Sequence, residues 1–312
     1  MNFLTEMAEQ PHALQTLLSN WSRQDPHLNL ASDKPVVFLG MGSSYFAGLY
    51  GAWLLNKQGM PAVAVEASMA RDDAGALVDS AGLWVLVSQS GESPEVLQLA
   101  DEAKGRNILG ITNEPDSQLA RYPFPVVTLD AGPETATTSK TYLNTLAVMA
   151  LLAGVSPEYL APIPAQIERL LNEPMLFPSV PRDLTLIGRG PSLTSAYQGA
   201  LILREGANVT ATGFSGAGFR HGPLQWGYDR DLISFSGWGR YRALQDQLYR
   251  DLVQQGNRIY QLGSEPADWS LPTAHNDLLP LLEIIIIERL LVSWAAEQGI
   301  EPGKLAHKVS RE

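Results

Sequence analysis

The 312-residue chain contains no cysteine, which excludes disulfides, thiolate metal ligands and a cysteine nucleophile. Basic residues are also scarce: 22 Lys and Arg stand against 33 Asp and Glu, a formal net charge of −11. An acidic chain without a basic run lacks the charge that neutralises phosphates, so no nucleic-acid partner is expected. No two histidines have the spacing of metal ligands, and we therefore predict no metal site.

Long hydrophobic runs are missing as well. The most apolar stretch, residues 278–294, is interrupted by one proline and three charged residues, and it predicts a buried helix rather than a membrane span. The first ten residues carry two acidic residues before any apolar run, which is not typical of a signal peptide. With 45% apolar residues available for a core, we expect a soluble, cytoplasmic, globular protein without a membrane partner.

Short apolar runs alternate with helix-length segments through the first half of the chain. Strands of this length with helices between them predict a parallel sheet that is covered on both faces. The predicted strands are Val36–Gly40, Ala62–Val65, Leu83–Ser88, Asn107–Thr112 and Phe124–Leu129.

The second half repeats this pattern at an offset of about 148 residues. The repeat places Leu184–Gly188 on the first strand, and Ile233–Ser236 on Val85–Ser88. Two matches in one register favour duplicated α/β lobes, although any two doubly wound domains share a Gly-x-Gly turn after the first strand. We predict a helical segment over residues 1–34, a first lobe over 35–155, a proline-rich connection over 156–182, and a second lobe with a C-terminal tail over 183–312.

The segment Ser88–Glu95 joins a predicted strand to a predicted helix. Ser93 followed by Pro94 is typical of a helix N-cap with proline at the first helical position. Three hydroxyls and several backbone amides would then meet at the positive end of a helix, where phosphate binding is favoured. The alternative is an ordinary capped loop.

A second hydroxyl-bearing turn, Gly40–Ser44, has the same strand-to-helix context. Tyr45 stands where a dinucleotide fingerprint needs its third glycine, so Ser43 and Ser44 are better interpreted as further ligands of a small phosphorylated molecule. The matching turns of the second half lack such hydroxyls, which predicts one phosphate site per chain.

Two residues of the second half are candidates for proton transfer. Glu205 lies in the last turn before Gly206, just after a predicted helix over residues 192–204. His221 lies in a glycine-rich loop from which it can reach a ligand. The alternative for Glu205 is a solvated carboxylate paired with Arg204 or Arg220.

Four motifs together resemble the sugar isomerase (SIS) family, and most closely the isomerase half of glucosamine-6-phosphate synthases. They are Gly42–Tyr45, Ser88–Ser93, Thr138–Lys140 and Arg220–Pro223, and the two ends, residues 6–11 and 305–310, are also similar. The resemblance covers nearly the whole chain. It implies two SIS lobes, each a flavodoxin-like parallel sheet flanked by helices.

The same resemblance implies roles for individual residues. Glu205 matches the base that moves a proton between C1 and C2, and His221 matches a ring-opening histidine that the partner subunit contributes, which implies a homodimer. In the tail, either His307 or Lys308 matches a catalytic lysine, and Ile202 stands where the synthases have an active-site lysine. The 6-phosphate would be held by Ser43, Ser44, Ser88, Gln89, Ser90 and Ser93, with Gly42 and Thr138 near the sugar.

These observations predict an enzyme that deaminates or isomerises an amino sugar 6-phosphate and needs no cofactor. The chain has neither a glutaminase domain nor a cysteine, so glutamine-dependent amination is not expected. Two alternatives stay open. One is a deglycase for phosphorylated fructose-amino acid conjugates, and the other is a non-catalytic regulator that binds a sugar phosphate.

Overall fold

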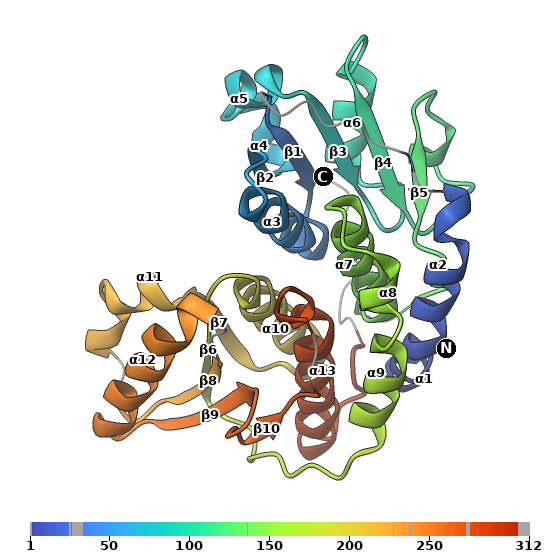
Figure 1. The fold of residues 1–312 in the computed structure, drawn as a ribbon. Helices are drawn as coiled ribbons and strands as arrows, with labels where there is room; N and C mark the ends of the chain where they lie inside the picture. The colour runs from blue at the N-terminus through green and yellow to red at the C-terminus, as the bar shows by residue number, and fades with distance from the viewer. Residues whose placement is uncertain are drawn as a thin grey trace. The chain divides into compact units, whose positions relative to one another are not determined.

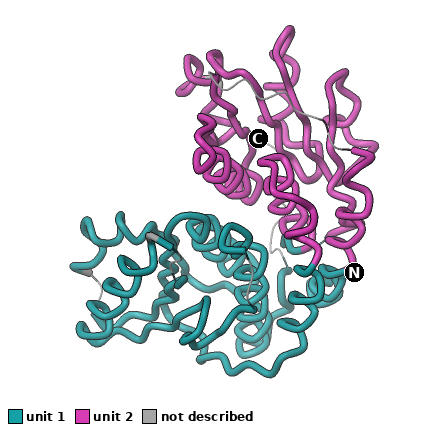
Figure 2. Tube along the Cα trace, viewed as in Figure 1, with its two compact units in different colours: residues 1–11, 135–139, 162–306 teal, residues 12–134, 140–161, 307–312 magenta. Residues whose placement is uncertain are grey.

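The computed structural model describes residues 2–24, 26, 34–135, 137–226, 228–236, 239–272 and 275–304; the side chains of residues 71, 226 and 240 are not described. Two compact units emerge, each discontinuous in sequence (Figure 2). Unit 2 contains residues 12–134, 140–161 and 307–312. Unit 1 contains residues 1–11, 135–139 and 162–306.

Unit 2 is built on a five-stranded parallel sheet with the order β2-β1-β3-β4-β5 (Figure 1). Its strands are β1 Val36–Gly40, β2 Ala62–Glu66, β3 Leu83–Val87, β4 Ile108–Thr112 and β5 Val126–Thr128. The predicted strands are therefore confirmed, with a shorter edge strand because Pro125 has no amide to donate. Its helices are α2 Gln10–Gln24, α3 Gly42–Lys57, α4 Ala67–Asp72, α5 Gly75–Ser80, α6 Pro94–Glu102, the short η1 Leu119–Arg121, α7 Lys140–Leu152 and α8 Pro157–Leu160.

Successive side chains of the central strands point to opposite faces of this sheet, and helices cover both faces. Val37 and Leu39 face a core formed with α4, α5 and α6. Phe38 faces the opposite side, where α3 packs closely against it. A Cβ at Gly48 would stand 2.9 Å from Cβ of Phe38, and a Cβ at Gly51 would stand 2.8 Å from the Phe38 ring. The strands are thus buried on both sides, as expected for a parallel sheet between helical layers.

Unit 1 repeats the arrangement with the order β10-β9-β8-β6-β7. Its strands are β6 Asp183–Gly188, β7 Thr210–Ser215, β8 Asp231–Phe235, β9 Arg258–Gly263 and β10 Trp269–Ser270. Its helices are α1 Phe3–Ala8, α9 Ile163–Asn172, α10 Ser192–Ala207, α11 Gly216–Arg220, α12 Arg242–Gln254 and α13 Pro280–Glu297, with the short η2 Pro223–Trp226, η3 Gly239–Tyr241 and η4 Asn276–Leu278.

The two sheets confirm the predicted duplication. Read from the same edge, both have their strands in the order second, first, third, fourth, fifth. A shift of 148 residues carries Gly40 at the end of β1 onto Gly188 at the end of β6, and Val87 at the end of β3 onto Phe235 at the end of β8. The two halves therefore have the same topology in the same register.

Helix α13 is the buried helix that residues 278–294 predict. Two carboxylates lie fully buried in it. Glu288 accepts two hydrogen bonds from the Gln10 amide, at 3.0 and 2.8 Å. Glu283 accepts from the hydroxyls of Ser192 and Ser195 on α10, each at 2.6 Å. Glu283 thus joins α13 to α10, and Glu288 joins it to Gln10, a residue of unit 1.

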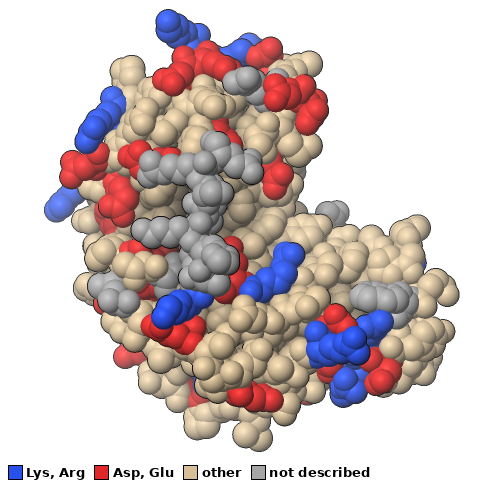
Figure 3. Space-filling view, turned by 180° about the vertical axis from the view of Figure 1, so that it is seen from behind, with Lys and Arg blue, Asp and Glu red and all other residues tan. Residues whose placement is uncertain are grey.

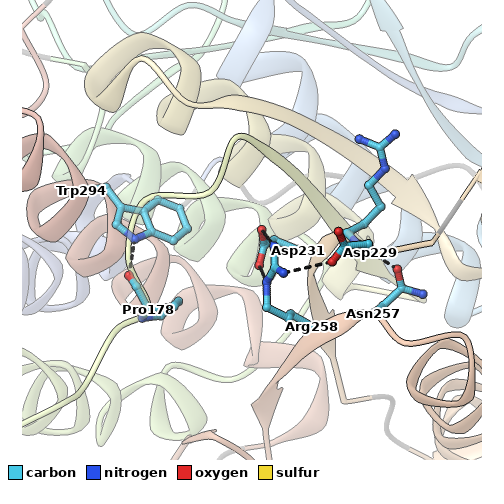
Figure 4. Close-up of polar contacts among 7 residues, drawn as sticks. Pro178, Asp229, Asp231, Asn257, Arg258 and Trp294 are labelled. Carbon is cyan, nitrogen blue, oxygen red and sulfur yellow. Dashed lines mark hydrogen bonds and ion pairs between the residues drawn. The ribbon is translucent and has the colours of Figure 1, made fainter.

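The amino-terminal edge of the second sheet is held by ion pairs (Figure 4). Arg258 donates two hydrogen bonds of 2.8 Å to Asp231 and one of 3.1 Å to Asp229. Near the carboxyl end of α13, the indole of Trp294 donates to the carbonyl of Pro178 at 2.8 Å. The ion pairs therefore fix the starts of β8 and β9. The turns that lead from strands into helices lie at the opposite edge.

Charge is mixed on the surface. On the face shown in Figure 3, basic side chains lie in separate groups with acidic ones among them, and they form no continuous basic stripe there. Within the described ranges, none of the helices combines the length and apolar character that crossing a bilayer requires.

We predict that Glu283 makes stability depend on pH. Burial is the main cause that raises the pKa of its carboxyl from 4.5 to about 7, and the two serine donors oppose that shift. Because the folded-state pKa is the higher one, the stabilising contribution is complete below about pH 4.5 and is lost as the pH rises through 7. Relative to Glu283→Gln, the wild-type free energy of unfolding should fall by on the order of 3 kcal/mol from pH 4.5 to 8.

Urea unfolding at several pH values measures this difference. Glu168→Gln, at an exposed site on α9, is the matched control and should follow the wild-type curve. Parallel pH curves for the wild type and Glu283→Gln would show that the buried carboxyl does not titrate in this range.

Candidate functional site

The first turn of the candidate site follows β1. Gly42 has φ +49°, a left-handed conformation that favours glycine, and it starts α3 immediately after the strand. A Cβ at Gly40 would stand 2.8 Å from Cβ of Ser44. Two glycines therefore let the chain reverse within a few residues, and Ser43 and Ser44 lie half-buried in the first turn of α3, beside the end of β1.

The second turn follows the neighbouring strand, β3. Ser88 is buried, and its hydroxyl lies 2.9 Å from the hydroxyl of Ser93. Gly91, at φ +63°, has no room for a side chain, since a Cβ there would stand 2.0 Å from Oγ of Ser117. Ser90 accepts a hydrogen bond from the Glu92 amide at 3.2 Å. The loop is thus fixed by its own contacts with its hydroxyls gathered at one end of the sheet.

Ser93 occupies the N-cap position of α6 and Pro94 follows it, as the sequence predicts. The Ser93 hydroxyl makes no capping bond, because it is paired with Ser88 instead. The first helical hydrogen bond runs from the Leu97 amide to the Ser93 carbonyl, so the amides of Glu95 and Val96 precede it. These amides and the positive end of the helix favour an anion at this position.

A cavity of about 310 Å³ lies beside these turns. Met41, just before Gly42, and Pro94, just after Ser93, both line it. Two carboxylates, Asp72 and Glu95, also line it, so this space favours a neutral or cationic group rather than a second phosphate.

Glu205 lies in unit 1, half-buried near the end of α10. The helix runs three residues beyond the predicted end, to Ala207, and Asn208 terminates it with φ +49°. The alternative pairings of Glu205 are both contradicted, because Arg204 donates to the carbonyl of Ala200 and Arg220 pairs with Asp251 at 2.6 Å.

The partner of Glu205 is a residue that sequence reasoning missed. The hydroxyl of Thr137, which is 2% exposed, donates to Oε2 of Glu205 at 2.6 Å. The Thr137 amide in turn donates to the carbonyl of Gly303 at 2.9 Å. Thr137 is close in sequence to the Thr138–Lys140 motif, but its contact with a residue 68 positions away has no signal in the sequence.

Gly206 allows the segment that contains Gly303 to pack against α10. The Gly303 amide donates to the carbonyl of Gly206 at 3.1 Å, and a Cβ at Gly206 would stand 3.0 Å from Cα of Gly303. Glycine is therefore required inside α10 because another backbone segment packs against it. The predicted helix end at Arg204 was therefore three residues short.

The remaining candidates are placed as follows. His221 caps the end of α11 and is exposed, and Thr138 lies half-buried in the same unit as Glu205. Ile202, one turn before Glu205, is fully buried and acts as a core residue. His307 and Lys308 lie outside the described residues.

No group of three or more metal-binding side chains occurs among the residues that the structure describes.

Comparison with known proteins gives a consistent result. Residues 29–154 match the family model of the SIS domain. The chain is 28% identical over 334 residues to the glutamine–fructose-6-phosphate aminotransferase (isomerizing) of Pyrococcus horikoshii, an alignment that covers 96% of this chain and 56% of that protein. The chain thus spans little more than half the length of the curated relatives it matches.

Two solved structures have the same fold. The C-terminal domain of glucosamine-fructose-6-phosphate aminotransferase from Francisella tularensis superposes with a TM-score of 0.80 at 22% identity, covering 97% of each chain. Glucosamine-6-phosphate deaminase from Thermotoga maritima gives 0.80 at 21% identity, covering 98% of each chain.

Residues 29–154 are therefore a SIS domain, and the chain as a whole shares the fold of these structures, with two parallel-sheet lobes. More particularly, it is similar in sequence to just over half of the isomerizing aminotransferase, and in fold to the C-terminal domain of such an aminotransferase and to the deaminase.

We predict that the serine loop of unit 2 binds phosphate. In an NMR titration with inorganic phosphate, the amide signals of Glu95 and Val96 should shift saturably. Replacing both Ser88 and Ser93 with alanine should weaken this binding about tenfold, because two hydrogen bonds to a charged group are removed.

The control is the double alanine variant at Ser19 and Ser80, two exposed serines that bond only to nearby carbonyls. Amide signals that do not move with phosphate, or equal affinities in the loop variant and the wild type, would contradict the assignment.

Proposed function

We propose that this protein processes a 6-phosphosugar, as an amino sugar 6-phosphate deaminase or isomerase. The single observation that carries the proposal is the Glu205 carboxylate, which Thr137 holds at 2.6 Å near the end of α10. Oε2 receives the threonine hydroxyl, while Oε1 has no hydrogen-bond partner among the described residues. A carboxylate held by one oxygen and open at the other is suited to taking and returning a proton.

Phosphate binding supplies the second part of the proposal. The phosphate group would be held by Ser44, Ser88, Ser90 and Ser93 with the first amides of α6, and Ser43 and Gln89 would complete the loops. Binding energy at the phosphate would orient the reacting carbons without acting on them directly. Gly42 and Thr138 would lie near the sugar hydroxyls.

Proton transfer would then proceed in the open-chain sugar. Glu205 would remove the proton from one of the carbons C1 and C2 and return it to the other. His221, contributed by the partner subunit of a homodimer, would transfer the proton of the ring oxygen when the ring opens. One of the tail residues His307 and Lys308 would close the site. The similarity to an isomerizing aminotransferase and to a deaminase supports this class of substrate.

A substrate panel tests the proposal. Glucosamine 6-phosphate, fructose 6-phosphate with ammonia, and phosphorylated fructose-amino acids are each incubated with the full chain and scored for ammonia, ketose and free amino acid. Glu205→Gln should lower kcat by about 100-fold or more, because the acid–base group is lost. Glu168→Gln should leave it unchanged.

Mixed dimers extend the same test to His221. Glu205→Gln and His221→Ala chains, each inactive alone, should regain part of the activity when mixed, since one complete site re-forms. Turnover by Glu205→Gln equal to wild type would contradict the role of Glu205, and absence of rescue would contradict a shared site. Release of a free amino acid alone would indicate a deglycase, and binding without turnover would indicate a regulator.

We further predict that Thr137 positions Glu205. Thr137→Val removes the donor but keeps the shape, so kcat should fall about tenfold with little change in KM. Thr137→Ser restores the hydroxyl and should recover most of kcat. Kinetic constants for the three proteins measure this effect, and equal loss in the valine and serine variants would point to packing rather than to the hydrogen bond.

A further inference from the structure

The turn after β6 in unit 1 is the duplicate of the serine turn after β1 in unit 2. The shift of 148 residues carries Gly42 onto Gly190, and both glycines are left-handed, with φ +49° and +59°. It also carries Met41 onto Arg189. The backbone of the turn is thus retained, while a guanidinium replaces a thioether at its start.

Hydroxyls are not available at this duplicate turn. Ser192, the counterpart of Ser44, directs its hydroxyl to the buried Glu283 at 2.6 Å. The sequence prediction of one phosphate site per chain depends on this absence of hydroxyls. Arginine, however, can take their place, because its planar donors match the oxygens of a phosphate or a carboxylate.

Arg189 is held in a fixed position. Its Nε donates to Oε1 of Gln245 at 3.0 Å. Gln245 is fully buried, and its amide donates to Oγ of Ser234 at 2.8 Å and to the carbonyl of Ile187 at 3.3 Å. A Cβ at Gly216 would stand 2.4 Å from Nε of Arg189, so the guanidinium lies directly against this backbone. A buried amide network therefore orients the arginine before any ligand arrives.

The charge of Arg189 has no compensating carboxylate among the described residues. Its single polar contact there is with the neutral Gln245. Other arginines near the second sheet are paired: Arg220 with Asp251, Arg242 with Asp246, and Arg258 with Asp231 and Asp229. Burial first, and then the nearby positive charge of Arg220, lower the pKa of Arg189. A partly buried cation without a carboxylate partner is unfavourable unless an anion binds.

We propose that Arg189, oriented by Gln245 and close to Arg220, binds the oxyanion group of a small metabolite, a phosphate or a carboxylate. This site lies at the carboxyl edge of the second sheet, where the first and third strands of that sheet are neighbours, the place where open parallel sheets bind ligands. It is separate in sequence from the serine loop of unit 2, and it gives the chain a second anion site in addition to the one in the proposed function.

An anion titration tests whether Arg189 binds a ligand. Inorganic phosphate and, separately, acetate are titrated into the full chain, while NMR follows the Gly190 amide and the Nε–H of Arg189. A saturable shift with phosphate identifies a phosphate site, and a shift with acetate alone identifies a carboxylate site. Arg189→Gln should weaken binding read at Gly190 by at least about tenfold, and Arg189→Lys, which keeps the charge but loses the planar donors, should weaken it less.

Arg258→Gln is the control, because it removes an arginine at the opposite edge of the same sheet and should keep the wild-type affinity. Absence of a saturable shift at both probes in the wild type would overturn the proposal, whether or not the variants fold. Unchanged affinity in folded Arg189→Gln would overturn it as well. The titration needs no turnover, so its failure leaves the proposed function standing, and inactivity of Glu205→Gln leaves this site untouched.

Discussion

The parallel direction of the strands is the constraint on which the rest of the molecule depends. Because all paired strands run the same way, every turn from a strand into a helix opens at the same edge of its sheet. Helix amino termini then gather at that edge, together with the side chains of the turns. The turns after β1 and β3, and those after β6 and β8, become neighbours through this geometry and not through their distance in sequence.

Duplication gave the protein two copies of this arrangement with different chemistry. In unit 2 the copy presents serine hydroxyls and the unpaired amides of α6. In unit 1 the corresponding serine is used internally, because Ser192 satisfies the buried carboxylate of Glu283. Arg189, which is hydrogen-bonded to the buried Gln245, lies at the carboxyl edge of this sheet instead. One backbone plan therefore presents hydroxyls in one unit and a guanidinium in the other, the two groups on which the proposed anion sites rest.

Glu205, the proposed base, shows how the position of one carboxylate depends on residues far from it in the chain. Its oxygen is held by Thr137, and Thr137 is tied to Gly303 through the backbone. Gly303 can lie there because Gly206 has no side chain. Three segments separated by tens of residues thus converge on one carboxylate, and a change at any of them would move it.

The sequence by itself determined the five strands of the first sheet, two strands of the second, the duplication at 148 residues and the buried nature of α13, because apolar periodicity and turn residues are local signals. It also located the serine loop and the N-cap position of Ser93. Only the tertiary structure decided that Ser93 pairs with Ser88 instead of capping its helix, that Glu205 meets Thr137, and that Gly206 packs inside α10. It likewise decided that, among the described residues, Arg189 pairs with Gln245 and with no carboxylate. Each of these depends on contacts between segments distant in sequence, whose side-chain partners no local pattern specifies.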